Sequence, residues 1–198
     1  KLKLPYEADS HPDLPSKEEI ERAMKDKPFT LGSGNAICNV GELVVKRGMN
    51  LSLLQEAENM LYLEQHSQVR TAKVYAVYAQ PRGTYQHPDG NDHDMYYLIT
   101  EYIEGETLTE SRWDSMGKEM QGIICDKLAE QMKLLRSVPA EGHYGRVHRQ
   151  PWIADIYHTP YPEVFGGPFN TWDEFLTNRI TVGEAELSIA TILTEWTE

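Results

Sequence analysis

Residues 43–65 read LVVKRGMNLSLLQEAENMLYLEQ and change from a strand pattern to a helical pattern within a few positions. The first four residues form an apolar, β-branched run that ends in Lys46. Ser52 and Gln55 have the spacing of a capping box, and the apolar residues that follow lie within half of a helical wheel. The stretch therefore predicts a strand followed by a helix over 53–65.

The predicted helix carries two acidic residues that differ in their surroundings. On the wheel Glu56 borders the apolar arc, whereas Glu58 lies on the polar side together with Tyr62. An inward carboxylate without a partner costs several kcal/mol, so Glu56 needs a cation, and Lys46 is the nearest candidate. We expect an ion pair between them. The alternatives are that Glu56 reaches water at the edge of the stripe and that Lys46 is a solvated strand end.

Upstream of this stretch, the pattern is that of an antiparallel hairpin. A short segment from Asn35 to Val40 precedes the strand that ends in Lys46, and Gly41 separates the two. An earlier flexible turn consists of Gly32-Ser33-Gly34-Asn35. A glycine-bearing hairpin is therefore expected to open the domain.

Residues 1–29 are expected to form an irregular arm and a short helix that pack on the lobe behind them. Ser16 and Glu19 have the spacing of a capping box, which predicts a helix that continues toward Lys27.

Downstream, two more strands and then only helices are expected. The strands are predicted over Val69–Ala79 and Met95–Tyr102, joined by a polar loop over 80–94, and Gly105 ends the strand region. Apolar residues at intervals of about four predict a long helix from Gly117 to Arg136.

The remainder of the chain predicts a loop over 140–168, a helix that begins at a Thr171–Glu174 capping box and runs to Ile180, and a last helix over 185–196. The expected architecture is α+β and bilobal. Its parts are the arm (1–29), a sheet lobe (30–104) and a partial, mainly helical lobe (105–198).

Composition excludes several classes of function. A net charge of −12 opposes binding to nucleic acid and tolerates a cationic ligand. No apolar run is long enough to span a membrane and no signal-peptide pattern opens the chain, so we expect no membrane contact and a cytoplasmic location. Cys38 and Cys125 lack the spacing of a disulfide framework and are expected to be buried, reduced thiols.

Four sequence blocks resemble, in order, those of the aminoglycoside-phosphotransferase-like family, which includes choline kinases. These blocks are Val44-Val45-Lys46-Arg47-Gly48, Glu56-Ala57, Lys73-Val74-Tyr75-Ala76 and the stretch from Tyr97 to Leu108. Later blocks resemble the versions found in filamentous fungi, namely Trp113, Leu134-Leu135-Arg136-Ser137-Val138-Pro139, Gly145-Arg146-Val147, Gly166-Gly167-Pro168-Phe169 and Glu174-Phe175. The resemblance implies a protein-kinase-like N-lobe followed by part of a C-lobe.

The resemblance also implies a nucleotide site for ATP and Mg²⁺. Lys46 would contact the α and β phosphates, and Glu56 would hold Lys46 in place. The hinge residues Glu101, Tyr102 and Ile103 would bind adenine through their backbone. The turn formed by Ser33, Gly34 and Asn35 would cover the phosphates. The alternatives are an ordinary edge strand at the hinge and an ordinary hairpin turn.

The catalytic half of the family pattern is missing. Neither the His-Gly-Asp segment that supplies the base nor the Asn and Asp that hold Mg²⁺ is found in the chain. We therefore assign no catalytic residue and no metal ligand, and expect the Mg²⁺ ligands outside this chain. We interpret Asn91-Asp92-His93-Asp94 as a turn, and His143, His148, His158 and Asp155 as solvated or core residues rather than a metal site.

Two functions are consistent with this pattern. The first is an ATP-dependent kinase of a small hydroxyl-bearing molecule, present as a fragment of a longer chain that continues past Glu198. The second is a catalytically inert pseudokinase that binds a nucleotide or a partner. If the chain is complete, the apolar stripe of the helix over 117–136 is uncovered, which predicts a homodimer.

Overall fold

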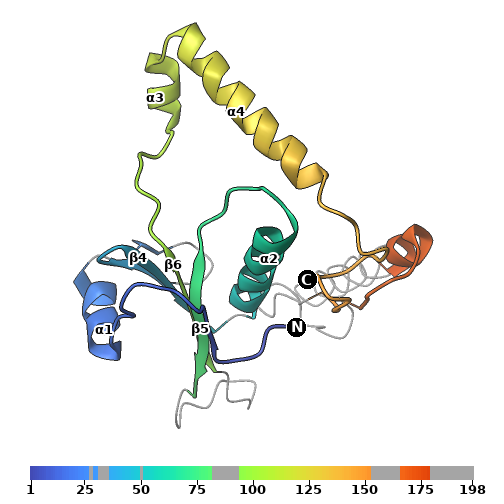
Figure 1. Cartoon of the computed structure of the whole chain (residues 1–198), viewed down its shortest axis with the longest axis horizontal. Helices are drawn as coiled ribbons and strands as arrows, with labels where there is room; N and C mark the ends of the chain where they lie inside the picture. The colour runs from blue at the N-terminus through green and yellow to red at the C-terminus, as the bar shows by residue number, and fades with distance from the viewer. Residues whose placement is uncertain (27–28, 31–35, 50, 82–93, 153–165, 179–198) are drawn as a thin grey trace, which may run out of the picture.

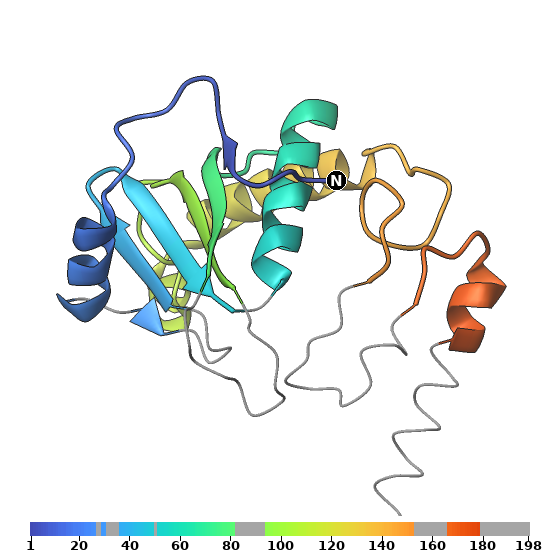
Figure 2. The ribbon, with the colours of Figure 1, turned by 90° about the horizontal axis from the view of Figure 1, so that it is seen from below.

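The computed structural model describes residues 1–26, 29–30, 36–49, 51–81, 94–152 and 166–178. In this part of the chain, six antiparallel strands form one sheet in the order β1-β5-β6-β4-β3-β2 (Figures 1 and 2). The strands are β1 (Tyr6–Glu7), β2 (Phe29–Thr30), β3 (Ala36–Val40), β4 (Leu43–Gly48), β5 (Val74–Gln80) and β6 (Met95–Glu101). The helices are α1 (Lys17–Asp26), α2 (Ser52–His66), α3 (Glu110–Ser115) and α4 (Lys118–Arg136). The α+β class is confirmed.

The two helices α1 and α2 cover opposite faces of the sheet (Figure 1). On the first face Ile20 of α1 packs with Cys38, Val45 and Ile99. The second face has a smaller core in which Ala57 of α2 packs with strand residues, among them Val77 and Leu98. Because side chains alternate along a strand, Val45 faces α1 and its neighbour Lys46 faces α2.

The predicted hairpin is confirmed, and position 41 in its turn requires a glycine. Its φ of +60° lies in the left-handed region that tight hairpin turns need and that side chains disfavour. The turn joins β3 to β4, with Val40 opposite Leu43. The predicted turn over 32–35 lies outside the described residues.

Two of the three predicted capping boxes are present. Ser16 N–H donates to Glu19 Oε2 at 2.8 Å and Glu19 N–H donates to Ser16 Oγ at 3.3 Å, so the helix begins as expected. Thr171 and Glu174 form the same reciprocal pair, and residues 172–178 are helical. The third prediction was wrong, because Ser52 is already the first helical residue of α2 and Leu51 stands at the N-cap. The expected helix over 185–196 lies outside the described residues.

The predicted start of the strand at Val69 was wrong by five residues. Residues 67–73 instead form an irregular connection, and the backbone N–H of Arg70 donates to Gln131 of α4 at 3.1 Å. The N–H of Arg70 is therefore not available to a strand ladder, and β5 begins at Val74.

The long helix α4 spans almost the residues that the sequence predicts. It stands away from the sheet in Figure 1, and none of its residues is buried. Among the described residues, no helix is both long enough and apolar enough to cross a membrane.

The prediction for the two cysteines was half wrong. Cys38 is fully buried in the sheet, and this burial raises the pKa of its thiol, whereas Cys125 is exposed on α4. The difference arises because, in the described part of the chain, no element buries any residue of α4.

The N-terminal arm belongs to the same layered unit as the sheet, since β1 pairs with β5 and α1 supplies Ile20 to the core. Ile20→Ala should reduce the free energy of unfolding by about 2–5 kcal/mol, because it leaves a cavity among well-packed neighbours. Urea denaturation followed by circular dichroism measures this loss. Ile123→Ala, on the exposed surface of α4, is the matched control and should change stability by less than about 0.5 kcal/mol. Equal effects would contradict the packing of α1.

Candidate functional site

An ion pair between Lys46 and Glu56 joins the sheet to α2. Lys46 Nζ contacts Glu56 Oε1, and both side chains are partly accessible, at 26% and 39% of their full exposure. The pair forms because Lys46 points to the α2 face of β4 and Glu56 points back from the first turns of the helix. The predicted ion pair is therefore present, and neither of its side chains is fully buried.

The predicted hinge segment lies at the far end of the same strand. Lys46 stands opposite Leu98 of β6, and Leu43 stands opposite Glu101. Leu43 and Lys46 are three residue steps apart along β4, which corresponds to about 10 Å. Lys46 and the predicted hinge segment thus lie at the two ends of one strand pair.

The backbone of the hinge segment is already partly used by the fold. The N–H of Glu101 donates to the carbonyl of Lys73 at 2.9 Å, and the N–H of Tyr102 donates to the carbonyl of Glu42 at 3.1 Å. Within the described part of the chain, the N–H of Ile103 forms no hydrogen bond, and its side chain is half-exposed. Of the three backbone N–H groups in the predicted hinge, only that of Ile103 has no hydrogen-bond partner among the described residues.

Several predicted residues cannot be placed. Ser33, Gly34 and Asn35 lie outside the described residues, as do most of the 91–94 segment, Asp155 and His158. Over the ranges that the structure describes, no three His, Cys, Asp or Glu side chains come together as a metal site. His143 bonds through Nε2 to the carbonyl oxygen of Arg146 at 3.0 Å, and His148 stacks edge-on against Tyr62.

Glu58 is the buried acid of α2, and the prediction that it lies on a solvated surface was wrong. Its side chain is only 4% exposed. Glu58 Oε1 accepts a hydrogen bond from the N–H of Leu2 at 2.7 Å. Glu58 Oε2 accepts from Arg146 Nη2 at 2.5 Å and from Gln150 Nε2 at 2.8 Å. We call these four residues the Glu58 clamp.

The helical wheel places Glu58 and Tyr62 on the polar arc of α2, but two distant segments cover this arc and bury both side chains. The N-terminal arm and the 141–150 segment both pack there, and Tyr62 is buried with Glu58. The sequence contained one indication of this burial. Tyr62 lies four positions after Glu58 on the same side of the helix, and a large aromatic side chain there is a reason to expect that another segment covers that side.

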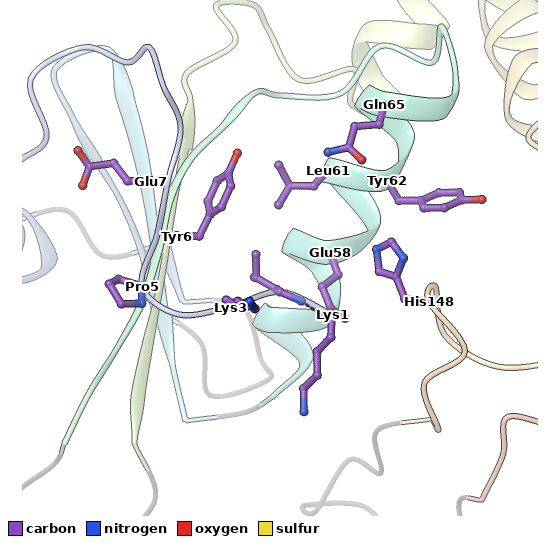
Figure 3. A pocket seen from close by; sticks show the side chains of 11 residues that line it. Lys1, Lys3, Pro5, Tyr6, Glu7, Glu58, Leu61, Tyr62, Gln65 and His148 are labelled. Carbon is purple, nitrogen blue, oxygen red and sulfur yellow. Dashed lines mark hydrogen bonds between the residues drawn. The ribbon is translucent and has the colours of Figure 1, made fainter.

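A cavity of about 410 Å³ lies between the arm and the outer side of α2 (Figure 3). Glu58, Tyr62 and His148 line it, and its floor includes Tyr6. Burial raises the pKa of Tyr6, and the nearby carboxylates of Glu64 and Asp9 add to the shift. Lys46 is not part of its lining, so this cavity is separate from the Lys46–Glu56 site.

Comparison with protein-family models, with curated proteins and with solved structures gave no match.

The two acids of α2 should differ in their effect on stability. Glu58→Ala leaves Arg146 buried without its counter-charge, which should reduce the free energy of unfolding by about 3–5 kcal/mol. Glu56→Ala removes a partly exposed pair and should cost only about 0–1 kcal/mol. Both exchanges place alanine in the same helix, so each is the control for the other. Urea denaturation at pH 7 measures both losses, and similar values would contradict the assignment of Glu58 as the buried acid.

Proposed function

We propose that this chain is the nucleotide-binding part of an ATP-dependent phosphotransferase that acts on a small hydroxyl-bearing molecule and has a protein-kinase-like architecture. The observation that carries the proposal is the ion pair between Lys46 and Glu56. Kinases of this architecture require a lysine on the third strand of the sheet lobe, held by a glutamate of the following helix. Here β4 is the third strand of the run β2-β3-β4, and α2 is the helix that follows it.

Lys46 would contact the α and β phosphates of ATP, and Glu56 would keep its ammonium group in place. The partial exposure of both side chains supports this role, because a fully buried pair could not meet a ligand. Adenine needs one donor and one acceptor. The N–H of Ile103 is the available donor, and a carbonyl of the same segment would accept. The turn with Ser33, Gly34 and Asn35 would cover the phosphates.

ATP supplies the transferred phosphoryl group, and Mg²⁺ neutralises its charge in reactions of this class. Residues 1–198 contain no His-Gly-Asp segment to supply the base, and we assign no Mg²⁺ ligand to them. The contribution of this chain is therefore binding and orientation of the nucleotide. The net charge of −12 favours a cationic acceptor.

Saturating ATP, at about 100 times its dissociation constant, should stabilise the chain by roughly 2.7 kcal/mol. Lys46→Ala should remove most of this gain, because it removes the phosphate contact. Lys73→Ala, which changes an exposed lysine immediately before β5, is the matched control and should retain it. Denaturation with and without ATP measures the difference. An unfolding curve of the parent chain that ATP does not change would contradict the proposed site.

A further variant separates adenine binding from phosphate binding in the same assay. Ile103→Pro removes the free N–H and spares the two hinge donors that the sheet uses. It should weaken stabilisation by ATP but leave that by inorganic triphosphate unchanged. Equal stabilisation of parent and variant by ATP would exclude Ile103 as the adenine donor.

A second candidate function is a catalytically inert kinase-like module that associates with a second copy of itself. The observation that favours it is the apolar surface of α4, where Met120, Leu128 and Met132 are about half-exposed. Apolar stripes of this kind associate in water.

This second candidate predicts a homodimer, in which Leu128→Glu should shift the equilibrium to the monomer. Sedimentation equilibrium over a range of concentrations measures the mass. A parent chain that remains monomeric over the whole range would contradict self-association and would leave the nucleotide site unaffected.

A further inference from the structure

The two acids of α2 point in nearly opposite directions and are bound by different parts of the chain. Glu56 and Glu58 are two positions apart, which places their side chains about 200° apart around the helix axis. Glu56 contacts Lys46 of the sheet. Glu58 is held by the arm and the 141–150 segment. The helix is thus tied on two sides.

The 141–150 segment is built to present Arg146 and Gln150 to Glu58. The backbones of these two residues bond to each other, at 2.9 Å and 3.3 Å, and close a tight loop. His148 and Arg149 inside this loop have φ values of 61° and 53°, a conformation that costs side-chain-bearing residues free energy. The N–H of His148 donates to Glu141 Oε2 at 2.8 Å and helps to hold the loop.

The Glu58 clamp is not an efficient way to stabilise the fold. Arg146 is 9% exposed, and within the described part of the chain its buried Nε has no hydrogen-bond partner. Buried ion pairs often contribute no more to stability than apolar side chains of the same size. Glu58 is thus bound by a buried arginine with an unsatisfied donor, which lies next to a strained loop. This arrangement indicates that the Glu58 clamp positions α2 rather than stabilises the fold.

The packing of α2 on the sheet depends largely on partly buried side chains. Its fully buried apolar residues are Leu53 and the small Ala57, and Leu54, Met60 and Leu61 pack against the core while remaining partly exposed. A helix with side chains has a radius of about 5–6 Å, so a rotation of about 20° moves a side-chain tip by about 2 Å. A movement of this size would separate Glu56 from Lys46.

We propose that Arg146 and Gln150 are positioning residues for the Lys46–Glu56 pair. By holding Glu58 on the outer side of α2, they set the rotation of the helix at which Glu56 reaches the sheet. The importance of this positioning for nucleotide binding rests on the proposed function. The effect of Arg146 and Gln150 on the Lys46–Glu56 pair itself is tested without nucleotide.

The test is the rate at which Lys46 is acylated by an amine-directed reagent, measured by mass spectrometry on the full chain. Glu58→Gln combined with Arg146→Met removes both buried charges together, so no unpaired charge remains in the fold. The rate at Lys46 should rise by about fivefold, the factor expected when a partly exposed ion pair opens. The rate at Lys73 should not change.

The matched control is Glu21→Gln, which breaks an ion pair of Arg47 with α1 on the opposite face of the sheet. It should leave the rate at Lys46 unchanged, although Arg47 is the next residue in the chain. A Lys46 rate equal to the parent's in the folded double variant would overturn the proposal. So would an equal rise in the Glu21→Gln control.

If the double variant does not fold, as judged by circular dichroism, Arg146→Lys is assayed in the same way, since it keeps the charge and loses the forked geometry. Unfolding of both variants would assign the clamp to overall stability and would also overturn the proposal.

ATP stabilisation is then measured on the same proteins. A parent that does not bind ATP contradicts the proposed function, whereas the acylation rates still decide the role of Arg146.

Discussion

The contact between Lys46 and Glu56 is the interaction on which the rest of the site depends. It crosses from the sheet to α2, and it exists because strand alternation turns Lys46 toward the helix and Arg47 toward α1. A shift of β4 by one residue would exchange these two cations between the faces. The hairpin at Gly41 and the ladder with β6 hold the register that prevents such a shift.

Helix α2 therefore makes two different contacts on opposite sides of its axis. The inner side offers a partly exposed carboxylate to the sheet. The outer side buries Glu58 under the N-terminal arm and the 141–150 segment. We propose that the two acids divide two tasks, because an accessible charge suits binding, whereas a buried, hydrogen-bonded carboxylate suits positioning.

Local patterns allowed much of the fold to be predicted, and the failures have physical reasons. The capping box at Ser16 and the glycine turn at Gly41 involve residues two to four positions apart, so a short window contains all the information. Residues 69–73 look like a strand because they adjoin one, but Gln131 of α4 takes the Arg70 donor. Ser52 has a plausible partner at Gln55, yet the helix begins one residue too early for that box.

The order of β3, β4, α2, β5, β6 and α4 followed from the sequence, because short apolar runs and helical periodicity indicate these elements, whereas β1, β2 and α3 were not predicted. The sequence also favoured the pairing of Lys46 with Glu56, which lie ten residues apart. Only the tertiary structure decided which acid of α2 is buried, since Arg146 reaches Glu58 across 88 residues and a helical wheel holds no information about such a cover. It also decided which backbone donor of residues 101–103 has no partner in the described part of the chain, because the carbonyl groups of Glu42 and Lys73 accept from the N–H groups of Tyr102 and Glu101.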